Sequence, residues 1–352
     1  MTEGGDRVIP GLVSVVIPVH DRPVVLVEAV HSALEQTYRP IEIVIVDDGS
    51  TDRTGAVADR LAATHPGVIH VIHQANGGPG VARQRGLEAS RGEYVQFLDS
   101  DDLLLPEKFA GQVAALQAHP ECQICYGRSF EEDHSIQPPK RQGPIRSTGI
   151  QLSRLFPLLL VERWWTTSSP LYRRHLLDRI GPWQAWINEE DWEYDARAGA
   201  TGAPLAWVPL DVSVRRIHMG DDHLSREGTT DPRKLSERAR AQASIYRSAR
   251  QAGVDPHARE MGQFARSAFL LCRQCGAAGV PEASRNLFHL AREASPPGVG
   301  RSLEYRLYGL LAACLGWCQA ARVSIRLQQS LPRLSMLRPS RLPIGSPKLG
   351  GL

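Results

Sequence analysis

Short apolar runs alternate with longer amphipathic stretches through the first 130 residues of the chain. The apolar runs predict strands, and the stretches between them repeat with the period of a helix. We expect strands at residues 13–18, 41–46, 68–72 and 94–98, and helices at residues 24–36, 54–64, 79–90 and 106–118. Because strands separated by helices are typical of βαβ units, the pattern predicts an α/β fold whose mainly parallel sheet is covered by helices.

The pattern changes after residue 130. Residues 131–148 are polar and contain proline, which indicates a surface loop. The next block predicts a mixture of helices and short strands. We expect helices at residues 149–160 and after Arg173 and Asp191, and strands at residues 205–208 and 212–217. From Pro232 onward the pattern is helical with Pro and Gly breaks, so a helical C-terminal appendage follows, with no regular structure after about Pro339.

Composition and charge narrow the class of protein. Among the 352 residues, 42% are hydrophobic and 22% are charged, which is typical of a globular protein. The net charge of +3 comes from 41 basic and 38 acidic residues, and this balance argues against a nucleic-acid partner. The charge is uneven, however, because no acidic residue follows Glu304. Seven cations do follow it: Arg306, Arg322, Arg326, Arg333, Arg338, Arg341 and Lys348.

Targeting segments are not evident in the sequence. Residues 1–18 lack the cationic start and long apolar core of a signal peptide. The uncharged stretch at residues 307–321 is shorter than the roughly 20 residues that cross a bilayer. We therefore expect a cytoplasmic protein. Its basic tail would also allow a peripheral position at the inner face of the membrane.

The six cysteines form three closely spaced pairs: Cys122 with Cys125, Cys272 with Cys275, and Cys314 with Cys318. The two C-x-x-C motifs are too far apart for a zinc ribbon. In a cytoplasmic protein we expect reduced, buried thiols rather than disulfides.

Acidic residues follow two of the expected strands. The strand at residues 41–46 is followed by Asp47 and Asp48, and the strand at residues 94–98 by Asp99, Asp101 and Asp102. Parallel strands end at the same sheet edge, where α/β proteins bind ligands. Helix capping explains one carboxylate per helix. A cluster of this size instead favours a divalent cation such as Mg²⁺ or Mn²⁺ together with substrate phosphates.

The runs SVVIPVHDRP, IVIVDDGSTDRT and NGGPGVARQRGLEASRGEYVQFLDSDD resemble the family 2 glycosyltransferases, which have the Rossmann-like GT-A fold. Two later segments, NEEDWEYDARAG and RRIHMGDDHLS, resemble further motifs of that family. All of them occur in the family's order over residues 12–225, and Gln84 departs from the usual Asn. The resemblance implies an inverting, metal-dependent transferase with Mn²⁺ or Mg²⁺ as its cofactor.

The resemblance also implies roles for individual residues. Asp101 would ligate the metal, with Asp99 and His218 beside it, and Asp191 would be the general base. Glu190 and Trp192 are acceptor candidates next to that base. The residues expected to bind the nucleotide-sugar are Pro18, His20, Asp48, Arg83, Asp99 and Ser100.

The resemblance and the hydrophobic pattern together predict a division of the chain into four parts. Residues 1–130 form the nucleotide-sugar-binding half of the GT-A domain, and residues 131–230 form the acceptor-binding half. Residues 231–338 form the helical C-terminal region, and residues 339–352 a flexible tail. The apolar and basic character of residues 301–341 leaves two alternatives open, which are a helix lying on an anionic membrane and a helix packed on the catalytic domain.

The expected donor is a nucleotide-diphospho-sugar, most commonly a UDP-sugar, and the expected acceptor is a glycan or a lipid-linked molecule in cell-envelope or exopolysaccharide synthesis. A small soluble aglycone is the alternative acceptor. From another class, a sugar nucleotidyltransferase would share the architecture, but it usually carries a Gly-rich basic loop after the first strand. Residues 20–23 are His-Asp-Arg-Pro at that place, so the chain lacks such a loop. A non-catalytic binding module is disfavoured because the acidic positions are all filled.

Overall fold

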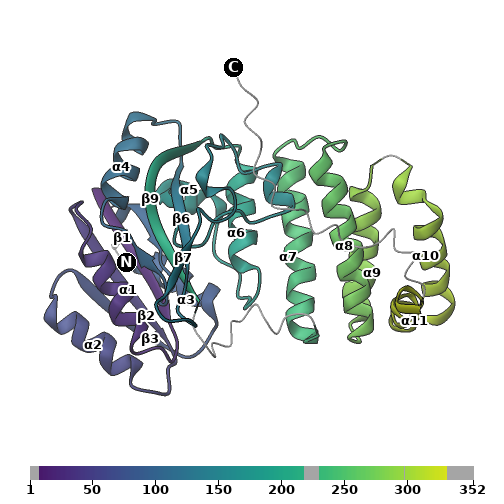
Figure 1. Cartoon of the computed structure of the whole chain (residues 1–352), viewed down its shortest axis with the longest axis horizontal. Coiled ribbons are helices and arrows are strands. Elements are labelled where there is room, and N and C mark those ends of the chain that lie inside the picture. Colours follow the sequence, from purple (N-terminus) through teal and green to yellow (C-terminus); the bar gives the residue numbers. More distant parts are fainter. Residues whose placement is uncertain (1–7, 218–229, 297, 331–352) are drawn as a thin grey trace, which may run out of the picture.

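The computed structural model describes residues 8–217, 230–296 and 298–330 of the chain. A sheet flanked by helices lies at one end of the molecule, and a row of helices extends from it to the other end (Figure 1). The long strands belong to the first part of the chain and the row of helices to the last part, as the sequence pattern predicts.

Within the described residues, nine strands form one mixed sheet with the order β3-β2-β1-β4-β8-β6-β9-β5, and β7 pairs with β6. Their bounds are β1 Ile9–Val19, β2 Ile41–Asp48, β3 Ile69–Gln74, β4 Gly92–Phe97, β5 Leu103–Leu104, β6 Ile124–Asp133, β7 Lys140–Gln142, β8 Leu171–Arg173 and β9 Leu205–Ile217. The four strands β3, β2, β1 and β4 pair in parallel, as do β6 and β9. The short strand β8 joins these two parallel groups through antiparallel pairs.

The parallel strands are apolar because helices cover them. Every residue of β2 is buried, including its final carboxylates Asp47 and Asp48. A parallel strand that is covered on both faces needs a continuous apolar run, which is the pattern in the sequence. The helices of this part are α1 Val25–Leu34, α2 Thr54–Thr64, α3 Pro79–Ala89, α4 Lys108–Ala118, α5 Arg174–Ile180 and α6 Glu190–Ala200. The four helices expected before residue 130 are therefore confirmed to within three residues at each end.

The segment after residue 130 differs from the expectation in two places. Residues 131–148 are not a plain loop, because β6 continues to Asp133 and pairs with β7. The prediction of a helix at residues 149–160 is wrong. Only short 3-10 turns lie in this region, at Arg146–Gly149 and Leu158–Leu160. Pro157 explains the failure, since proline lacks the N–H of a helix interior and restricts the residue before it.

The two strands expected between residues 205 and 217 are one strand, β9. The register of its pairing with β6 shifts between Tyr126 and Ser129. Pro209 lies opposite that irregularity, where proline does not cost a ladder hydrogen bond. The sequence pattern therefore showed the break in pairing but not the continuity of the strand.

The C-terminal region is helical, as expected. Its helices are α7 Pro232–Gln251, α8 Arg259–Ala277, α9 Pro281–Ala294, α10 Leu303–Leu315 and α11 Trp317–Ser330. Proline occupies the first turn of α7 and α9, where its missing N–H costs nothing. One continuous apolar core contains Trp164 and Trp165 from the sheet end together with Leu235 and Ile245 of α7. Residues 339–352 lie outside the described residues.

The cysteines are free thiols, and four of the six are buried as expected. Cys314 is exposed, so the expectation of burial is wrong there. In the part of the chain that the structure describes, no helix is long and apolar enough to cross a membrane.

A lysine is fully buried on α4. Lys108 has no exposed surface, and its Nζ donates to the backbone oxygen of Ser169 at 2.7 Å. Gln112 Nε2 donates to the same oxygen at 3.0 Å. Burial lowers the pKa of Lys108 well below its usual value, because the charged form is poorly solvated there.

This burial makes stability depend on pH. Because the folded state binds the Lys108 proton less tightly than the unfolded state, stability should rise with pH between the lowered pKa and the normal value of about 10.4. Lys108→Met keeps the volume and should remove this slope, which amounts to at most roughly 1.4 kcal/mol per pH unit. The free energies of unfolding in urea at several pH values test this. Parallel pH profiles for the wild type and the variant would contradict it.

Candidate functional site

The carboxylate at the end of β2 is held by the loop that precedes α3. The backbone N–H groups of Gly77 and Gly78 donate to the two oxygens of Asp48, each at 2.8 Å. Gln74 Nε2 donates to Asp48 Oδ1 at 2.7 Å. A carboxylate offers about four acceptor positions, so Asp48 can still accept one further hydrogen bond. Asp48 therefore fixes this loop and still has one acceptor position for an N–H group of a ligand.

A histidine and an asparagine lie beside Asp48. His20 Nδ1 lies 3.0 Å from the backbone oxygen of Asp48. Asn76 Nδ2 lies 3.4 Å from the same ring, and the ring itself is exposed. Pro18 is partly buried on β1, where it pairs with Val46 of β2. These residues form an open polar corner at the carboxyl edge of the sheet.

Two arginines neutralise the carboxylates that follow β4. Arg22 forms an ion pair with Asp101. Arg83 of α3 is buried, and its guanidinium donates to Asp99 Oδ1 at 2.8 Å and to Glu190 Oε1 at 2.7 Å. A single guanidinium therefore connects the turn after β4 with the start of α6.

The third carboxylate of this turn is structural. Asp102 is buried and accepts hydrogen bonds from Ser168 Oγ at 2.7 Å and from the backbone N–H of Arg216 at 3.3 Å. Burial, and then repulsion from Asp101 and Asp99, raises the pKa of Asp102 well above its usual value. Arg216 Nε also donates to the backbone oxygen of Asp101 at 2.5 Å. These contacts hold the shape of the turn, so Asp99 and Asp101 are the members that face outward.

The start of α6 carries two more carboxylates, Glu190 and Asp191. The residue before them, Glu189, has left-handed backbone geometry with a φ of 59°. Its carboxylate accepts from Arg238 Nε at 2.7 Å and from Gln242 Nε2 at 2.9 Å, both on α7. The C-terminal region therefore fixes the first turn of α6, whose dipole favours negative charge at this end.

A buried arginine holds Asp191. Arg163 Nη1 donates to Asp191 Oδ2 at 2.7 Å, and Arg163 Nε donates to Asp195 Oδ2 at 2.7 Å. Thr167 Oγ1 donates to the same oxygen of Asp191 at 3.4 Å. Since Asp195 fixes the guanidinium from behind, Arg163 can orient Asp191 without free rotation.

The two neighbouring carboxylates of α6 have opposite pKa shifts. Burial works to raise the pKa of Asp191, but Arg163 and Arg83 outweigh burial and lower it. Burial, and then repulsion from Asp191, raises the pKa of Glu190 to about 7, although Arg83 opposes this rise. Asp191 thus remains ionised over a wider pH range, and Glu190 is the member of the pair that can hold a proton.

The tryptophans of this region are mainly structural. Trp164, Trp165 and Trp183 are buried in the core. Trp192, the acceptor candidate, is partly buried, and its Nε1 donates to the backbone oxygen of Leu159 at 2.7 Å. This hydrogen bond fixes the Trp192 ring next to Asp191, where the sequence predicts contact with the acceptor.

Hydrogen bonds directly join three of the expected site residues. The contacts link the turn after β4 to the start of α6 through Asp99, Arg83 and Glu190. Ser100 is buried in that turn. His218 lies outside the described residues. The structure adds three residues that the sequence did not single out, namely Arg22, Asn76 and Arg163. The first two stand inside the quoted motifs, whereas nothing in the sequence marks Arg163.

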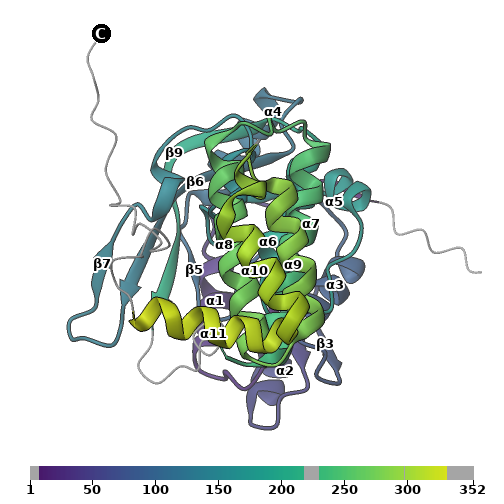
Figure 2. The same cartoon turned by 90° about the vertical axis from the view of Figure 1, so that its right-hand side faces the viewer.

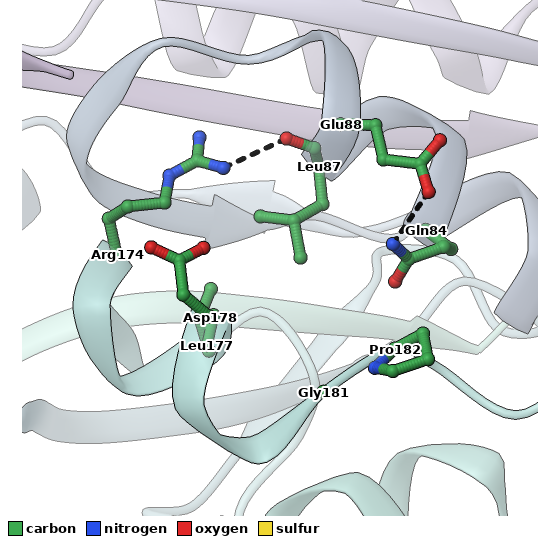
Figure 3. Close-up of a pocket in the computed structure, with 8 residues that line it drawn as sticks. All are labelled: Gln84, Leu87, Glu88, Arg174, Leu177, Asp178, Gly181 and Pro182. Atoms are coloured by element: carbon green, nitrogen blue, oxygen red, sulfur yellow. Dashed lines mark hydrogen bonds between the residues drawn. The ribbon is translucent and has the colours of Figure 1, made fainter. Parts of the chain in front are cut away.

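A separate cavity of about 250 Å³ lies between α3 and α5 (Figure 3). Arg174 points along its wall and donates to the backbone oxygen of Leu87 at 2.9 Å, and Gln84 donates to Glu88. The guanidinium of Arg174 also donates to backbone oxygens of Ser90 and Gly92. These contacts tie the end of α3 to α5, so the guanidinium of Arg174 has a structural role.

Comparisons with known proteins find similarity to glycosyltransferases. A family model described as glycosyl transferase family 2 matches residues 14–181. A protein of Nostoc sp., named as an uncharacterized glycosyltransferase, is 31% identical over 243 residues, which are 66% of this chain and 72% of that protein. The glycosyltransferase GlyG of Streptococcus pneumoniae is 43% identical over 125 residues, or 35% of this chain. The uncharacterized glycosyltransferase EpsJ of Bacillus subtilis is 42% identical over 173 residues, or 48% of this chain. The chain spans 41% of the length of GlyG and 49% of the length of EpsJ.

The fold also matches a solved structure. The crystal structure of S. aureus TarS in complex with UDP-GlcNAc has a TM-score of 0.65 and 19% sequence identity. The match covers 90% of this chain and 92% of that one, so it extends beyond the sheet into the C-terminal helices. The expected GT-A architecture with its helical appendage is therefore confirmed.

The bridge made by Arg83 can be tested by stability. Arg83→Met would leave Glu190 and Asp99 without their shared counter-ion, and breaking a buried ion pair costs about 3–5 kcal/mol. Adding Glu190→Gln should recover part of this loss, because the substitution removes one of the unpaired charges. The measurement is a double-mutant cycle from urea unfolding. Arg85→Met, on the exposed side of α3, is the control and should change stability by less than about 0.5 kcal/mol. Equal losses from the two arginine variants would contradict the bridge.

Proposed function

Because the chain belongs to glycosyl transferase family 2, we propose that it is an inverting, metal-dependent glycosyltransferase that uses a nucleotide-diphospho-sugar. The observation that carries this proposal is the contact of Arg83 with both Asp99 and Glu190. It brings together the two acidic clusters of the site, which are Asp99 with Asp101 after β4 and Glu190 with Asp191 at the start of α6. A transferase needs both groups, because one serves the leaving diphosphate and the other the incoming hydroxyl.

The nucleotide would bind at the polar corner beside β1 and β2. Asp48 has a free acceptor position for a base N–H, and Pro18 and His20 border the same corner. TarS, which shares the fold, is in complex with UDP-GlcNAc. On this basis the donor proposed for this chain is a UDP-sugar, held with its diphosphate toward Asp99, Ser100 and Asp101.

The acidic turn after β4 fits a divalent cation. Asp99 and Asp101 offer hard oxygen ligands, and both are partly exposed at the site. The described residues contain no group of three or more His, Cys, Asp or Glu side chains that could hold a metal ion by themselves. Mg²⁺ usually takes one or two carboxylates and completes its shell with water and substrate phosphates. Asp101 and Asp99 would therefore hold Mn²⁺ or Mg²⁺ together with the donor, and His218 is proposed as a further ligand.

The cation supplies charge stabilisation to the leaving diphosphate when it is bound. Arg22 and Arg83 neutralise the same carboxylates in this structure, so they limit repulsion at the site. Arg83 also lies close enough to the turn to serve the anionic part of the donor.

Asp191 is the proposed general base. Its side chain is 28% exposed, whereas that of Glu190 is 8% exposed and occupied by Arg83. The acceptor oxygen attacks the anomeric carbon, the bond to the diphosphate breaks with its electron pair, and the proton moves to Asp191. A base with a lowered pKa remains ionised and accepts the proton late, as the new bond forms. Attack from the face opposite the diphosphate inverts the anomeric centre, so one carboxylate suffices.

The acceptor is proposed to be a glycan or a lipid-linked molecule of cell-envelope or exopolysaccharide synthesis. Trp192, next to Asp191, is an aromatic residue of the kind that stacks against sugar rings. A cytoplasmic enzyme at the inner face of the membrane would meet a lipid-linked acceptor there. A small soluble aglycone is the alternative acceptor. A sugar nucleotidyltransferase is excluded by the family.

The metal proposal predicts the behaviour of one variant. Asp101→Asn keeps the shape of the side chain but removes an anionic ligand, so turnover should fall by about 10²-fold or more. Binding of UDP-GlcNAc, measured by calorimetry with Mn²⁺ and with EDTA, should lose its response to the metal. Asp211→Asn, on the surface of β9, is the control and should keep that response. Wild-type turnover that EDTA leaves unchanged would overturn the metal assignment.

The base assignment predicts a separation of binding from chemistry. Asp191→Asn should lower kcat by about 10²–10⁴-fold while the donor Kd changes little, since the lost group acts on the acceptor proton. Glu190→Gln should be the milder variant. Steady-state rates and donor binding, measured for both variants, decide between the carboxylates. If Glu190→Gln is inactive and Asp191→Asn is active, Glu190 is the base.

A further inference from the structure

Helix α10 is apolar on two opposite faces. Its inner face buries Tyr305, Tyr308 and Ala312. The two tyrosine rings lie 4.7 Å and 5.2 Å from the ring of Phe269, so they belong to an aromatic cluster shared with α8. This face accounts for the attachment of α10 to the rest of the molecule.

The outer face carries exposed leucines. Leu303, Leu307 and Leu310 are 70%, 56% and 63% exposed. Spacings of four and three residues place them on one stripe, and exposed Cys314 continues it by another four. Leu315 and Leu327 are the other exposed leucines of the described residues, so every exposed leucine there lies on α10 or α11.

The position of this stripe makes it unusual. α10 and α11 lie at the end of the molecule farthest from the sheet, and Figure 2 shows both helices on that end face (Figures 1 and 2). The terminal helix of a stacked array normally presents a polar outer face, because no further helix covers it. A helix that is apolar all round is normally covered by something, and a contiguous exposed apolar patch marks a contact surface.

The charges beside the stripe indicate what covers it. The exposed charged side chains of α10 and α11 are Glu304, Arg306, Arg322 and Arg326, an excess of cations. The 22 residues that follow Ser330 add four cations and no acid. We infer that the end face formed by α10 and α11 binds the surface of an anionic lipid bilayer. The leucines would enter the boundary between headgroups and acyl chains, and the arginines would meet the lipid phosphates.

A second copy of the chain fits this face less well. A symmetric contact would place the same patch against itself and bring the arginines of the two copies together. A bilayer with anionic headgroups supplies the opposite charge. The inferred role is attachment, because the face lies away from Asp99 and Asp191, and it does not depend on the donor or acceptor proposed above.

Vesicle binding tests the inference on the full chain. Wild-type protein is sedimented with vesicles of equal parts phosphatidylcholine and phosphatidylglycerol, and with vesicles of phosphatidylcholine alone, at low and high salt. We expect binding to the anionic vesicles at low salt, and weaker binding at high salt or without the anionic lipid. Leu307→Gln with Leu310→Gln should weaken partitioning by about tenfold or more, because two apolar side chains no longer insert.

A matched control separates this face from general stickiness. Ile136→Gln with Ile150→Gln changes two side chains that are each 45% exposed in the sheet half, and it should bind like the wild type. All four substitutions are on exposed side chains, and circular dichroism checks that both double variants are folded. Wild-type protein that ignores anionic vesicles at low salt overturns the inference. So does equal loss from both double variants. Light scattering that shows a dimer dissociated by the leucine substitutions would assign the face to a second copy and overturn it as well.

Discussion

Repulsion among carboxylates at one edge of the sheet is the constraint on which the rest of the structure depends. Asp99, Asp101 and Asp102 lie within five residues of the end of β4, and Glu190 and Asp191 lie at the start of α6. Such a cluster is stable only if each charge has a partner or is lost. Three arginines supply the partners. They are Arg22, Arg83 and Arg163. The raised pKa of Asp102 favours loss of the remaining charge.

The arginines also join parts of the chain that are far apart in sequence. Arg83 of α3 connects the turn after β4 with α6, and Arg163 connects the segment before β8 with α6. α7 holds the first turn of α6 through Arg238. The helical region is therefore part of the site's support, and it shares a core with the sheet end. The acidic site and the C-terminal helices are therefore in contact through these residues.

The two ends of the molecule use charge in opposite ways. At the sheet edge, acids gather and buried arginines compensate for them within the fold. At the far end, exposed arginines and exposed leucines occur together on α10 and α11. The carboxylates at the sheet edge therefore have their counter-ions within the chain. At the far end, the leucines of α10 remain exposed within the described residues.

The sequence by itself determined the features that depend on neighbours along the chain. The alternation of apolar runs and helical patterns predicted β1 to β4 and α1 to α4, because burial on both sides of a strand leaves a local signature. The motifs after those strands located Asp48, Asp99 and Asp101. Pro157 ended a helix that periodicity had predicted, and that signal was available in the sequence but outweighed by the apolar pattern.

Only the tertiary structure decided which charges meet. Arg83 and Glu190 are 107 residues apart, and Arg163 lies on a segment without regular structure, so no periodicity or spacing could pair them. The same holds for the exposed side of α10. The sequence left open whether this helix packs on the catalytic domain or lies on a membrane, and the predicted burial of Cys314 was wrong, because composition records that a face is apolar and not whether another helix covers it. Coverage and ion pairing are properties of the packed chain, since they depend on which distant elements come into contact.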